Sequence, residues 1–415
     1  MKLKQIQLSL PPALQFPAYR NFWLGMFGAV GGFQVLMFGQ FWLMHELTGS
    51  PLHLGYVGVA NAIPAILLNL FGGVIADKAD KKKLIIWTET LSASLVFLLG
   101  LLTVLGVVEV WHIIAIAVVS GAINAFNQPA RQALYPHLVD REALTSAVAL
   151  NAAVWTGTRI VAPAIAGILI ATLGTASSFF FACGGMLIFS LVIYFLKVPE
   201  IKSTSSGNPA QDLMEGLRFI KNNSIFLFLI SMAFFNSFFG MAYVTQMPVF
   251  TREILKIDAD GQGLLLSING IGSLMMTLYW GLRRDTRNKG LILIGGASLA
   301  GLSLAAFSLS SHYVGSFLLA AILMFCMGIS NSTFLISVMS SLQMMVPNEM
   351  RGRVMGFWGI TWNIYPLGGL YAGILAGFIG MPFAIALGGL LVVIFAVGPA
   401  LLNPQIRNLG TLLSS

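Results

Sequence analysis

The sequence predicts an all-α membrane protein with twelve transmembrane helices, and three observations lead to this fold class. Of the 415 residues, 57% are hydrophobic and only 9% are charged, with a mean hydropathy of +0.84, which is more apolar surface than a soluble core can bury. Apolar runs of roughly 18 to 26 residues, about the length that crosses a bilayer, recur along the chain. Because irregular backbone cannot face lipid, each run is predicted to form a helix.

The twelve apolar runs fall into two sets of six. The first set is expected near residues 22–47, 53–76, 84–106, 110–127, 146–171 and 178–197, and the second near 224–249, 263–282, 290–311, 313–336, 354–379 and 381–402. The first run exceeds the apolar core of a signal peptide, so we interpret it as an uncleaved span. Three prolines are predicted to kink their helices without breaking them: Pro64, Pro163 and Pro366.

The basic residues predict the orientation of the chain. If the N-terminus is cytoplasmic, the outside connectors hold only Arg252 and Lys256. The inside connectors then hold Lys78, Lys81 to Lys83, Arg131, Arg141, Lys197, Lys202, Arg218, Lys221, Arg283, Arg284, Arg287, Lys289, Arg351 and Arg353. This asymmetry predicts a multi-pass protein of the inner membrane with both termini cytoplasmic. It also explains the net charge of +8 without any binding of nucleic acid.

One polar segment, "PEIKSTSSGNPAQDLMEGLRFIKNN" at residues 199–223, separates the two sets of helices. Its first part resembles a flexible Ser/Gly linker, and the apolar spacing from Pro209 onward predicts a short amphipathic helix at the cytoplasmic membrane face. The chain is therefore divided into an N-terminal six-helix bundle at 1–198, a linker at 199–222 and a C-terminal six-helix bundle at 223–415.

The two bundles are expected to be related by pseudo-symmetry, because two connector patterns recur. Gly73-x-x-x-Asp77 is matched by Gly281-x-x-x-Asp285, and Gln132-x-x-x-Pro136 is matched by Gln343-x-x-x-Pro347. Both pairs are separated by about 210 residues, and all four patterns lie in inside connectors. A duplicated bundle of this kind suits transport by alternating access.

The stretch "GGVIADKADKKKL" at residues 72–84 carries a family resemblance. It resembles the loop motif that the major facilitator superfamily places between its second and third helices. Asp80 stands where the broad family has Gly, and this resembles the drug:proton antiporter branch that includes the enterobactin exporter and macrolide efflux proteins. Further stretches resemble the same branch: "LTGSPLHLG" (47–55), "QPARQALYPHLVDREAL" (128–144), "RIVAPAIAG" (159–167) and "VPNEMRGRV" (346–354). Ala162 departs from the Gly-Pro of the antiporter motif.

The resemblance implies a gate at the cytoplasmic loop. In the family, the loop Asp pairs with basic groups in one conformational state and releases them in the other. Carried over, Asp77 is the latch, and Arg131, Arg351 and Arg353 are its candidate partners. The remaining motif positions are Gly73, Lys78, Lys81, Lys82 and Asp285, and the helix-packing motif is carried by Pro163 and Gly167. The lysines are explained equally well by membrane topology, whereas an acid contributes little to topology.

Polar residues inside the apolar runs are candidates for contact with a substrate or with protons. Arg159 lies in the middle of its run, where a lone cation costs about 2.5–3.5 kcal/mol on insertion scales, so it is expected to face the bundle interior with a partner. Glu46 and Glu89 are expected nearer the membrane interfaces and are candidate proton carriers. Gln34 and Asn124 are expected to line a cavity. The alternatives are a structural role for Arg159 and simple helix association for the amides.

Motifs that are missing from the sequence narrow the function. It contains no G-x-x-x-x-G-K-[ST] loop for ATP, no H-E-x-x-H and no nucleophile elbow, so neither an ATPase nor a membrane enzyme is expected. Cys183 and Cys326 lie in apolar runs and predict neither a metal site nor a disulfide. We therefore expect a monomeric secondary transporter without cofactors that exports a small amphipathic molecule, such as a drug, macrolide or siderophore, in exchange for protons. A channel, an importer or uniporter, and a non-transporting scaffold remain the alternatives.

Overall fold

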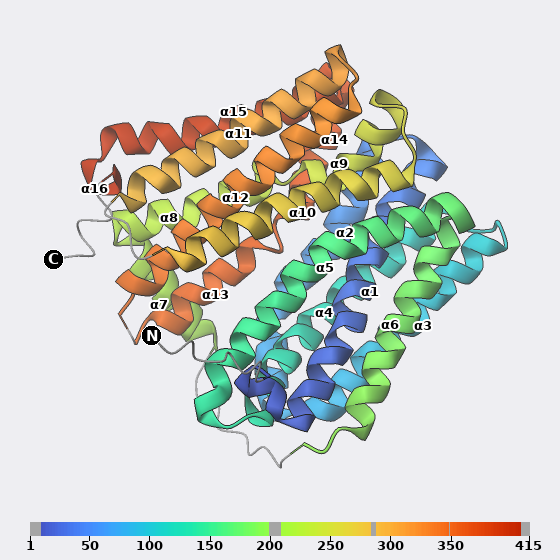
Figure 1. Cartoon of the computed structure of the whole chain (residues 1–415), viewed down its shortest axis with the longest axis vertical. Coiled ribbons are helices and arrows are strands. Elements are labelled where there is room, and N and C mark those ends of the chain that lie inside the picture. The colour runs from blue at the N-terminus through green and yellow to red at the C-terminus, as the bar shows by residue number, and fades with distance from the viewer. Residues whose placement is uncertain (1–9, 199–208, 284–287, 348, 408–415) are drawn as a thin grey trace, which may run out of the picture.

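The computed structural model describes residues 10–198, 209–283, 288–347 and 349–407. Its first bundle consists of six long helices that pack against one another (Figure 1). They are α1 (Pro17–Thr48), α2 (Pro51–Lys78), α3 (Lys81–Val104), α4 (Val110–Leu134), α5 (Leu144–Leu173) and α6 (Thr175–Phe195). Glycines permit close crossings, as where Gly28 of α1 faces Gly185 of α6 backbone to backbone.

The second bundle follows the linker helix α7 (Pro209–Lys221). Its members are α8 (Ser224–Phe235), the π-helical turn η4 (Asn236–Gly240), α9 (Tyr243–Pro248), the π-helical turn η5 (Val249–Ile254), α10 (Ala259–Leu282), α11 (Lys289–Tyr313), α12 (Phe317–Met345), α13 (Arg351–Thr361), α14 (Tyr365–Ile379), α15 (Met381–Leu402) and the short α16 (Pro404–Arg407). The elements from α8 to η5 together make one crossing of the membrane, which spans Ser224–Ile254.

One predicted helix is divided in the structure. The run at 354–379 was expected to be continuous, but it forms α13 and α14 with a turn at residues 362–364 between them. Pro366 was expected to sit inside a kinked helix and instead lies in the first turn of α14, because proline lacks the N–H that a continuous helix would use. Pro64 and Pro163 do lie inside unbroken helices, as predicted. Neither α13 nor α14 alone is long enough to span a bilayer, so eleven of the twelve expected spans are found as long apolar segments in the described residues.

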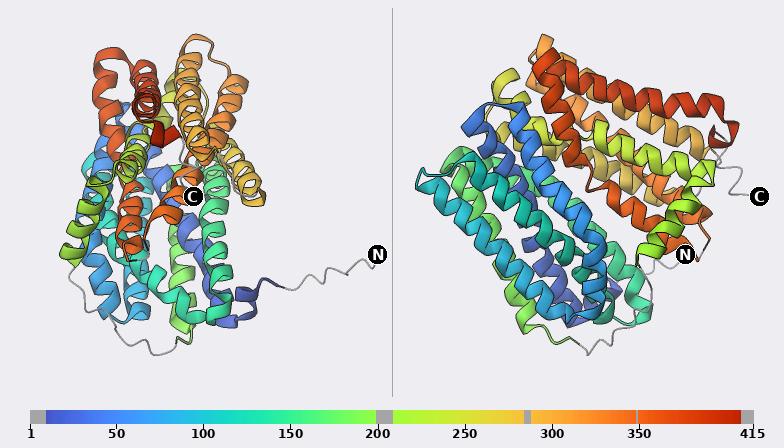
Figure 2. Two further views of the ribbon diagram at one scale, coloured as in Figure 1. Left: turned by 90° about the vertical axis from the view of Figure 1, so that its left-hand side faces the viewer. Right: turned by 180° about the vertical axis from the view of Figure 1, so that it is seen from behind.

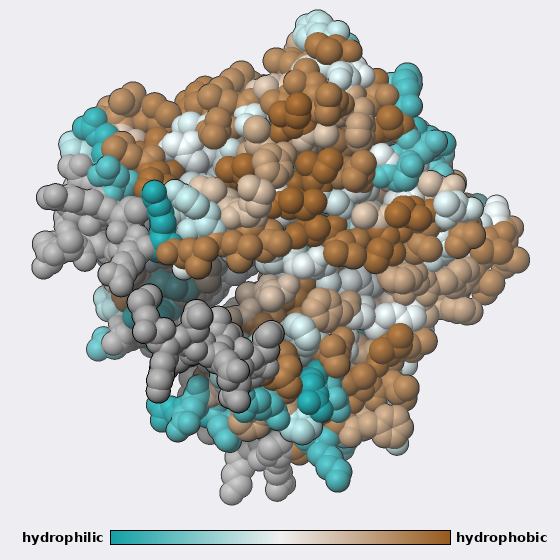
Figure 3. All heavy atoms as spheres, viewed as in Figure 1, coloured by the Kyte–Doolittle hydropathy of each residue, from teal (hydrophilic) through white to brown (hydrophobic). Residues whose placement is uncertain are grey.

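The outer surface of the bundles is apolar, as lipid contact requires. Large apolar side chains stand exposed on several helices, among them Trp87, Leu282, Phe378 and Leu402. Figure 3 shows such residues in brown over both bundles. A soluble protein would not expose this many large apolar side chains. The predicted all-α membrane fold is therefore confirmed.

The two bundles touch at one end of the molecule and diverge toward the other (Figures 1 and 2). We call the touching end, where α1 ends and α2 begins, the sealed end, and the opposite end, which holds α7, the linker end. At the sealed end α5 packs on α10, and α2 packs on α14. A Cβ on Gly263 would meet the carbonyl oxygen of Pro163, and one on Gly58 would meet that of Pro366. The seal therefore depends on backbone-to-backbone contact that larger residues would prevent.

The linker helix α7 packs on the second bundle at the linker end. It contacts α13 and α8, and the side chain of Glu215 forms an ion pair with Arg353 of α13, with Oε2 2.6 Å from Nη1. Gly216 lies against Arg353 and Phe357 of the same helix. The predicted amphipathic helix is present, whereas the Ser/Gly stretch at 199–208 lies outside the described residues.

Candidate functional site

The central site lies between the bundles at the middle of the membrane. Arg159 stands near the middle of α5, and its guanidinium carbon is 5.8 Å from the ring centroid of Trp362, in the turn between α13 and α14. Tyr243 and Tyr365 are close enough to interact electrostatically with the Arg159 charge. We call these four residues the arginine cage. The cage draws one residue from the first bundle and three from the second.

Interrupted helices position the cage. Trp362 lies in the break before α14 and Tyr365 is the first residue of α14, whereas Tyr243 begins α9 directly after the break that follows η4. On the opposite side, Pro163 has no N–H to bond the carbonyl of Arg159, which loosens α5 at this point. Breaks of this kind place binding groups near the midplane of many transporters.

The cage lies at the inner limit of the seal. Contacts between α5 and α10 extend from Gly167, which faces Ala259, to Gly270, which faces Ile160 and the carbonyl of Arg159. Ser267 of α10 also donates a hydrogen bond to the carbonyl of Ile160 at 2.5 Å. Beyond this level the bundles diverge, and Figure 3 shows a hollow between them. A molecule that enters from the linker end would therefore reach the cage and be stopped there by the seal.

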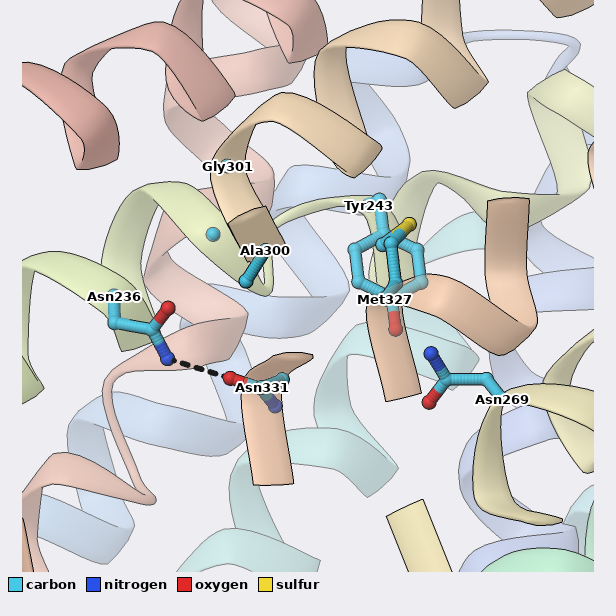
Figure 4. A pocket seen from close by; sticks show the side chains of 8 residues that line it. Asn236, Tyr243, Asn269, Ala300, Gly301, Met327 and Asn331 are labelled. Atoms are coloured by element: carbon cyan, nitrogen blue, oxygen red, sulfur yellow. Dashed lines mark hydrogen bonds between the residues drawn. The ribbon is translucent and has the colours of Figure 1, made fainter. Parts of the chain in front are cut away.

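A small pocket of the second bundle lies beside the cage and shares Tyr243 with it (Figure 4). Three amides line it: Asn236 of η4, Asn269 of α10 and Asn331 of α12. Asn236 Nδ2 donates to Asn331 Oδ1 at 3.0 Å, and Asn269 Nδ2 donates to the Met324 carbonyl at 3.0 Å. The amides thus join helices and also present polar atoms to the pocket.

Charged and polar residues of both bundles meet at the sealed end. Glu46 of α1 lies 3.9 Å from Arg252 of η5, and His45 lies 3.4 Å from Glu253. Thr175 also donates a hydrogen bond of 2.6 Å to Glu46. Glu46 was expected near the outer end of its helix, where it lies, and its charged partner there is Arg252.

A third polar cluster lies inside the first bundle. Glu89 of α3 is only 4% exposed, and its Oε1 lies 3.7 Å from Arg131 Nη1 of α4. Asn127 donates to the same oxygen at 3.0 Å and to Thr88 at 2.7 Å. Glu89 was expected to reach toward an interface and Arg131 to lie in a connector, and the structure corrects both expectations. The two side chains are buried because each supplies the charge that the other needs.

The residues of the predicted gate lie in different surroundings. Lys78 is exposed at the end of α2, Lys81 is buried at the start of α3, and Lys82 Nζ donates to the Leu196 carbonyl at 2.8 Å. Gly73 has open space where a Cβ would stand, and Arg351 is exposed. The side chain of Asp77 and all of Asp285 lie outside the described residues. The gate therefore stays a prediction.

Asp80, where the broad family has Gly, has a local role. Its carboxylate accepts a hydrogen bond from the backbone N–H of Lys83 at 3.1 Å, and it is the N-cap of α3. Aspartate is among the preferred residues at this position, because its oxygen satisfies an N–H that has no partner in the helix. The departure from the family pattern thus provides a helix cap.

The remaining predicted residues lie along the inner helices. Gln34 Nε2 donates a hydrogen bond of 2.8 Å to Oγ1 of Thr158, the residue that precedes Arg159 in α5. Asn124 is half-buried in α4. Gly167 and Pro163 lie at the crossing of α5 with α10. Residues that the sequence did not single out include Tyr243, Trp362, Tyr365, His45 and Glu253. For Trp362 and Tyr365 the sequence did carry a signal in Pro366. The residue before a proline is biased away from the helical conformation, which indicates a helix break close to these two residues.

The fold and the cage together define a membrane transporter of the major facilitator class, in which two bundles enclose a central site. Solved structures share this arrangement. A POT family transporter in complex with a thioalcohol-conjugated peptide has a TM-score of 0.73 at 11% identity, covering 95% of this chain and 98% of its own. An inward-facing, unoccupied bacterial homologue of the human lysosomal transporter Spinster has a TM-score of 0.69 at 13% identity, covering 98% of both chains.

This chain belongs to the transmembrane secretion effector family, whose profile matches residues 9–410. Macrolide efflux protein A of Streptococcus pyogenes is 22% identical over 400 residues, which are 94% of this chain and 97% of that protein. The multidrug efflux pump Tap of Mycolicibacterium fortuitum is 26% identical over 376 residues, 85% of this chain and 87% of Tap. The staphyloferrin A transporter of Staphylococcus aureus (strain NCTC 8325 / PS 47) is 28% identical over 250 residues, and the match spans 58% of this chain and 61% of that transporter. The protein is thus a multi-pass membrane transporter and not an enzyme.

Proposed function

We propose that the protein exports a small amphipathic molecule from the cytoplasm by alternating access, in exchange for protons. One observation carries the proposal: in the described residues, the extensive packing of α5 on α10 and of α2 on α14 lies at the sealed end, so the cage would be reached from the linker end, where α2 also contacts the linker helix α7. The basic residues favour a cytoplasmic linker end, with both termini on that side. The conformation is then inward-facing, and a molecule from the cytoplasm binds before the seal opens.

The movement that we propose is a rocking of residues 1–198 against residues 223–415, with 199–222 as the linker. The contacts that must separate include the glycine crossings, the hydrogen bonds from Ser267 to the Ile160 carbonyl and from Gln246 to the Pro51 carbonyl, and the pairs of Glu46 with Arg252 and His45 with Glu253. The pair of Glu46 with Arg252 is partly exposed, and exposed ion pairs contribute only about 0–1 kcal/mol each, so this pair adds little to the cost of opening the seal. On the other side, closure would bring the loop of Asp77 toward the second bundle.

For proton coupling we propose Glu89. It is the one buried acid whose side chain the structure describes, and its carboxylate is held by Arg131 and Asn127. Protonation would release Arg131 from its partner and so change the packing of α3 on α4. The macrolide, multidrug and siderophore transporters among the relatives support a small-molecule cargo for this chain.

Transport by inside-out membrane vesicles tests the proposal. Vesicles that contain the full chain are given an acidic interior and offered a macrolide, staphyloferrin A or the hydrophobic cation tetraphenylphosphonium. We expect at least one probe to accumulate above the level of vesicles without the protein, and a protonophore to abolish the accumulation. Equilibration without accumulation would instead indicate a uniporter, and accumulation only in right-side-out vesicles an importer.

Two variants of the loop sharpen this test. We expect Asp77→Asn to reduce accumulation about tenfold, within the usual range of coupling between conformational states. Asp80→Asn is the matched control, because asparagine also caps a helix and the transport rate should be unchanged. Wild-type transport by well-expressed Asp77→Asn would refute the gate and leave topology as the role of this loop.

A further inference from the structure

We propose that the arginine cage selects organic anions: its cargo is an amphipathic molecule with a carboxylate or similar oxyanion and a flat apolar portion. The proposal rests on the function proposed above and specifies the substrate class for the same site. It follows from the charge balance of the cage, from the hydrogen-bonding capacity of its side chains and from its aromatic walls.

The charge of Arg159 is not balanced by the described residues. Three arginines of the described part are not fully exposed: Arg131, Arg159 and Arg353. Arg131 lies 3.7 Å from Glu89 and Arg353 lies 2.6 Å from Glu215. Arg159 has no carboxylate within 4 Å among the described residues, and its close contact is the face of Trp362. A cation at mid-membrane is expected to have a partner, so a ligand would supply the anion that the described residues do not.

The polar atoms of the cage are suited to an acceptor. A guanidinium carries five N–H donors and an indole carries one, and neither can accept a hydrogen bond. The hydroxyls of Tyr243 and Tyr365 can donate as well, and no described residue forms a hydrogen bond with these hydroxyls or with the Trp362 indole. A carboxylate accepts up to four hydrogen bonds and can be held by both arms of a guanidinium at once. A cationic cargo would meet the like charge of Arg159 and would find acceptors only in the two tyrosine hydroxyls among these four side chains.

The aromatic side chains around Arg159 indicate the chemistry of the remaining, uncharged part of the cargo. Trp358 and Trp362 meet edge to face with centroids 6.5 Å apart, and Trp362 and Tyr365 are both half-buried. Aromatic faces of this kind bind flat apolar groups, and their negative quadrupole also holds Arg159 in place. An inorganic anion would satisfy the guanidinium and leave the aromatic surface uncovered.

Binding to the full-length protein in lipid nanodiscs tests the proposal without any gradient. Three probes share one apolar tail: 4-(2-naphthyl)butyrate, its uncharged amide and 4-(2-naphthyl)butylammonium. By isothermal titration calorimetry at neutral pH, we expect the anion to bind about tenfold or more tightly than either partner, as a charge-assisted hydrogen bond provides. Inorganic phosphate and acetate serve as tail-free anions and should bind about tenfold more weakly than the naphthyl anion.

Variants assign the selectivity to Arg159. Arg159→Gln should bring the three naphthyl probes within about twofold of one another, and Arg159→Lys should retain part of the preference. The matched control is Arg252→Gln, because Arg252 also lies over a tryptophan, with 5.7 Å from its Cζ to the Trp42 centroid, but already has Glu46 as a partner. This control should keep the wild-type preference for the anion.

Three results would overturn the inference: equal binding of the anion and the ammonium by the wild type, an anion preference that survives in Arg159→Gln, or phosphate that binds as tightly as the naphthyl anion. The binding assay does not depend on transport. Loss of the anion preference therefore leaves the export proposal intact, and failure of the vesicle assay leaves the anion preference intact.

Discussion

Two arginines in the membrane interior, Arg131 and Arg159, have opposite surroundings. Arg131 is buried between α3 and α4, where Glu89 balances its charge and Asn127 completes the network. Arg159 faces the space between the bundles, and the described residues offer it aromatic faces and no carboxylate. The first arrangement is complete within one bundle. On our proposal the second becomes complete only when an anion binds, which would distinguish a charge balanced within one bundle from a charge that awaits a ligand.

The largest expected difference between the two sites is in stability. Arg131→Gln leaves Glu89 buried without its counter-charge, and breaking a buried pair in this way costs about 3–5 kcal/mol. Arg159→Gln removes a charge that has no protein partner, so we expect a change below about 1 kcal/mol. Thermal unfolding of both variants in the same detergent measures the difference.

A double substitution provides the control for this comparison. Glu89→Gln combined with Arg131→Gln removes both charges and should recover about 1–3 kcal/mol relative to the sum of the single substitutions. Equal losses of stability for Arg131→Gln and Arg159→Gln would show that both arginines are structural, and the distinction between the two sites would fail.

The second-largest expected effect is a change of conformation at the sealed end, which should alter binding at Arg159 and leave the Glu89–Arg131 pair unchanged. A Cβ at Gly167 would collide with the backbone of Ala259, so Gly167→Leu should part the bundles at the sealed end and shift the equilibrium between states about tenfold. Gly157→Leu is the matched control on the same helix, because nothing stands within 4 Å of its Cβ. Labelling of a cysteine introduced at Thr48, in a background without Cys183 and Cys326, reports opening.

We expect Gly167→Leu to increase this labelling and to weaken binding of the naphthyl anion, with unchanged thermal stability of the first bundle. Unaltered labelling in a well-folded Gly167→Leu protein would mean that the glycine crossing does not control the seal.

The smallest expected effect concerns the aromatic face. Trp362→Leu removes the cation–π contact, which contributes about 0.5–2 kcal/mol, and should weaken binding of the naphthyl anion about threefold to fivefold. Trp362→Phe keeps an aromatic face and should therefore lose less affinity for the naphthyl anion than Trp362→Leu. Calorimetry on both variants tests the order, and equal affinity of Trp362→Leu and the wild type would remove Trp362 from the cage.

Much of this fold was predictable because the membrane restricts the chain to helices. Hydropathy located the spans, and the cost of a mid-membrane charge singled out Arg159. The partners of the charged residues were not predictable. Helices that are apolar on all sides have no polar face from which to deduce which side faces inward, so the pairing of Glu89 with Arg131 could not be deduced.

The helix breaks were missed for a related reason. An apolar run predicts a span of the right length, but it does not show where the backbone leaves the helix, and residues 362–364 are as apolar as their neighbours apart from Asn363. The cage therefore emerged only from the three-dimensional arrangement, since Trp362, Tyr365 and Tyr243 come from two interrupted spans. Family resemblance identified the loop of Asp77 but not the cap that Asp80 provides.

The unbalanced charge of Arg159 also determines which electrical force acts on the transport cycle. Arg159 stays with its helix while an anionic cargo crosses the whole membrane, so each export event moves a net negative charge outward. With a cytoplasm that is negative by about 100 mV, this movement releases about 2.3 kcal/mol per charge, a concentration ratio of about fiftyfold. On the proposed export of an anion, the resting voltage of the cell would thus drive the cargo out even when the pH is equal on both sides, and export would be electrogenic because the cargo carries its charge across while that of Arg159 stays with its helix.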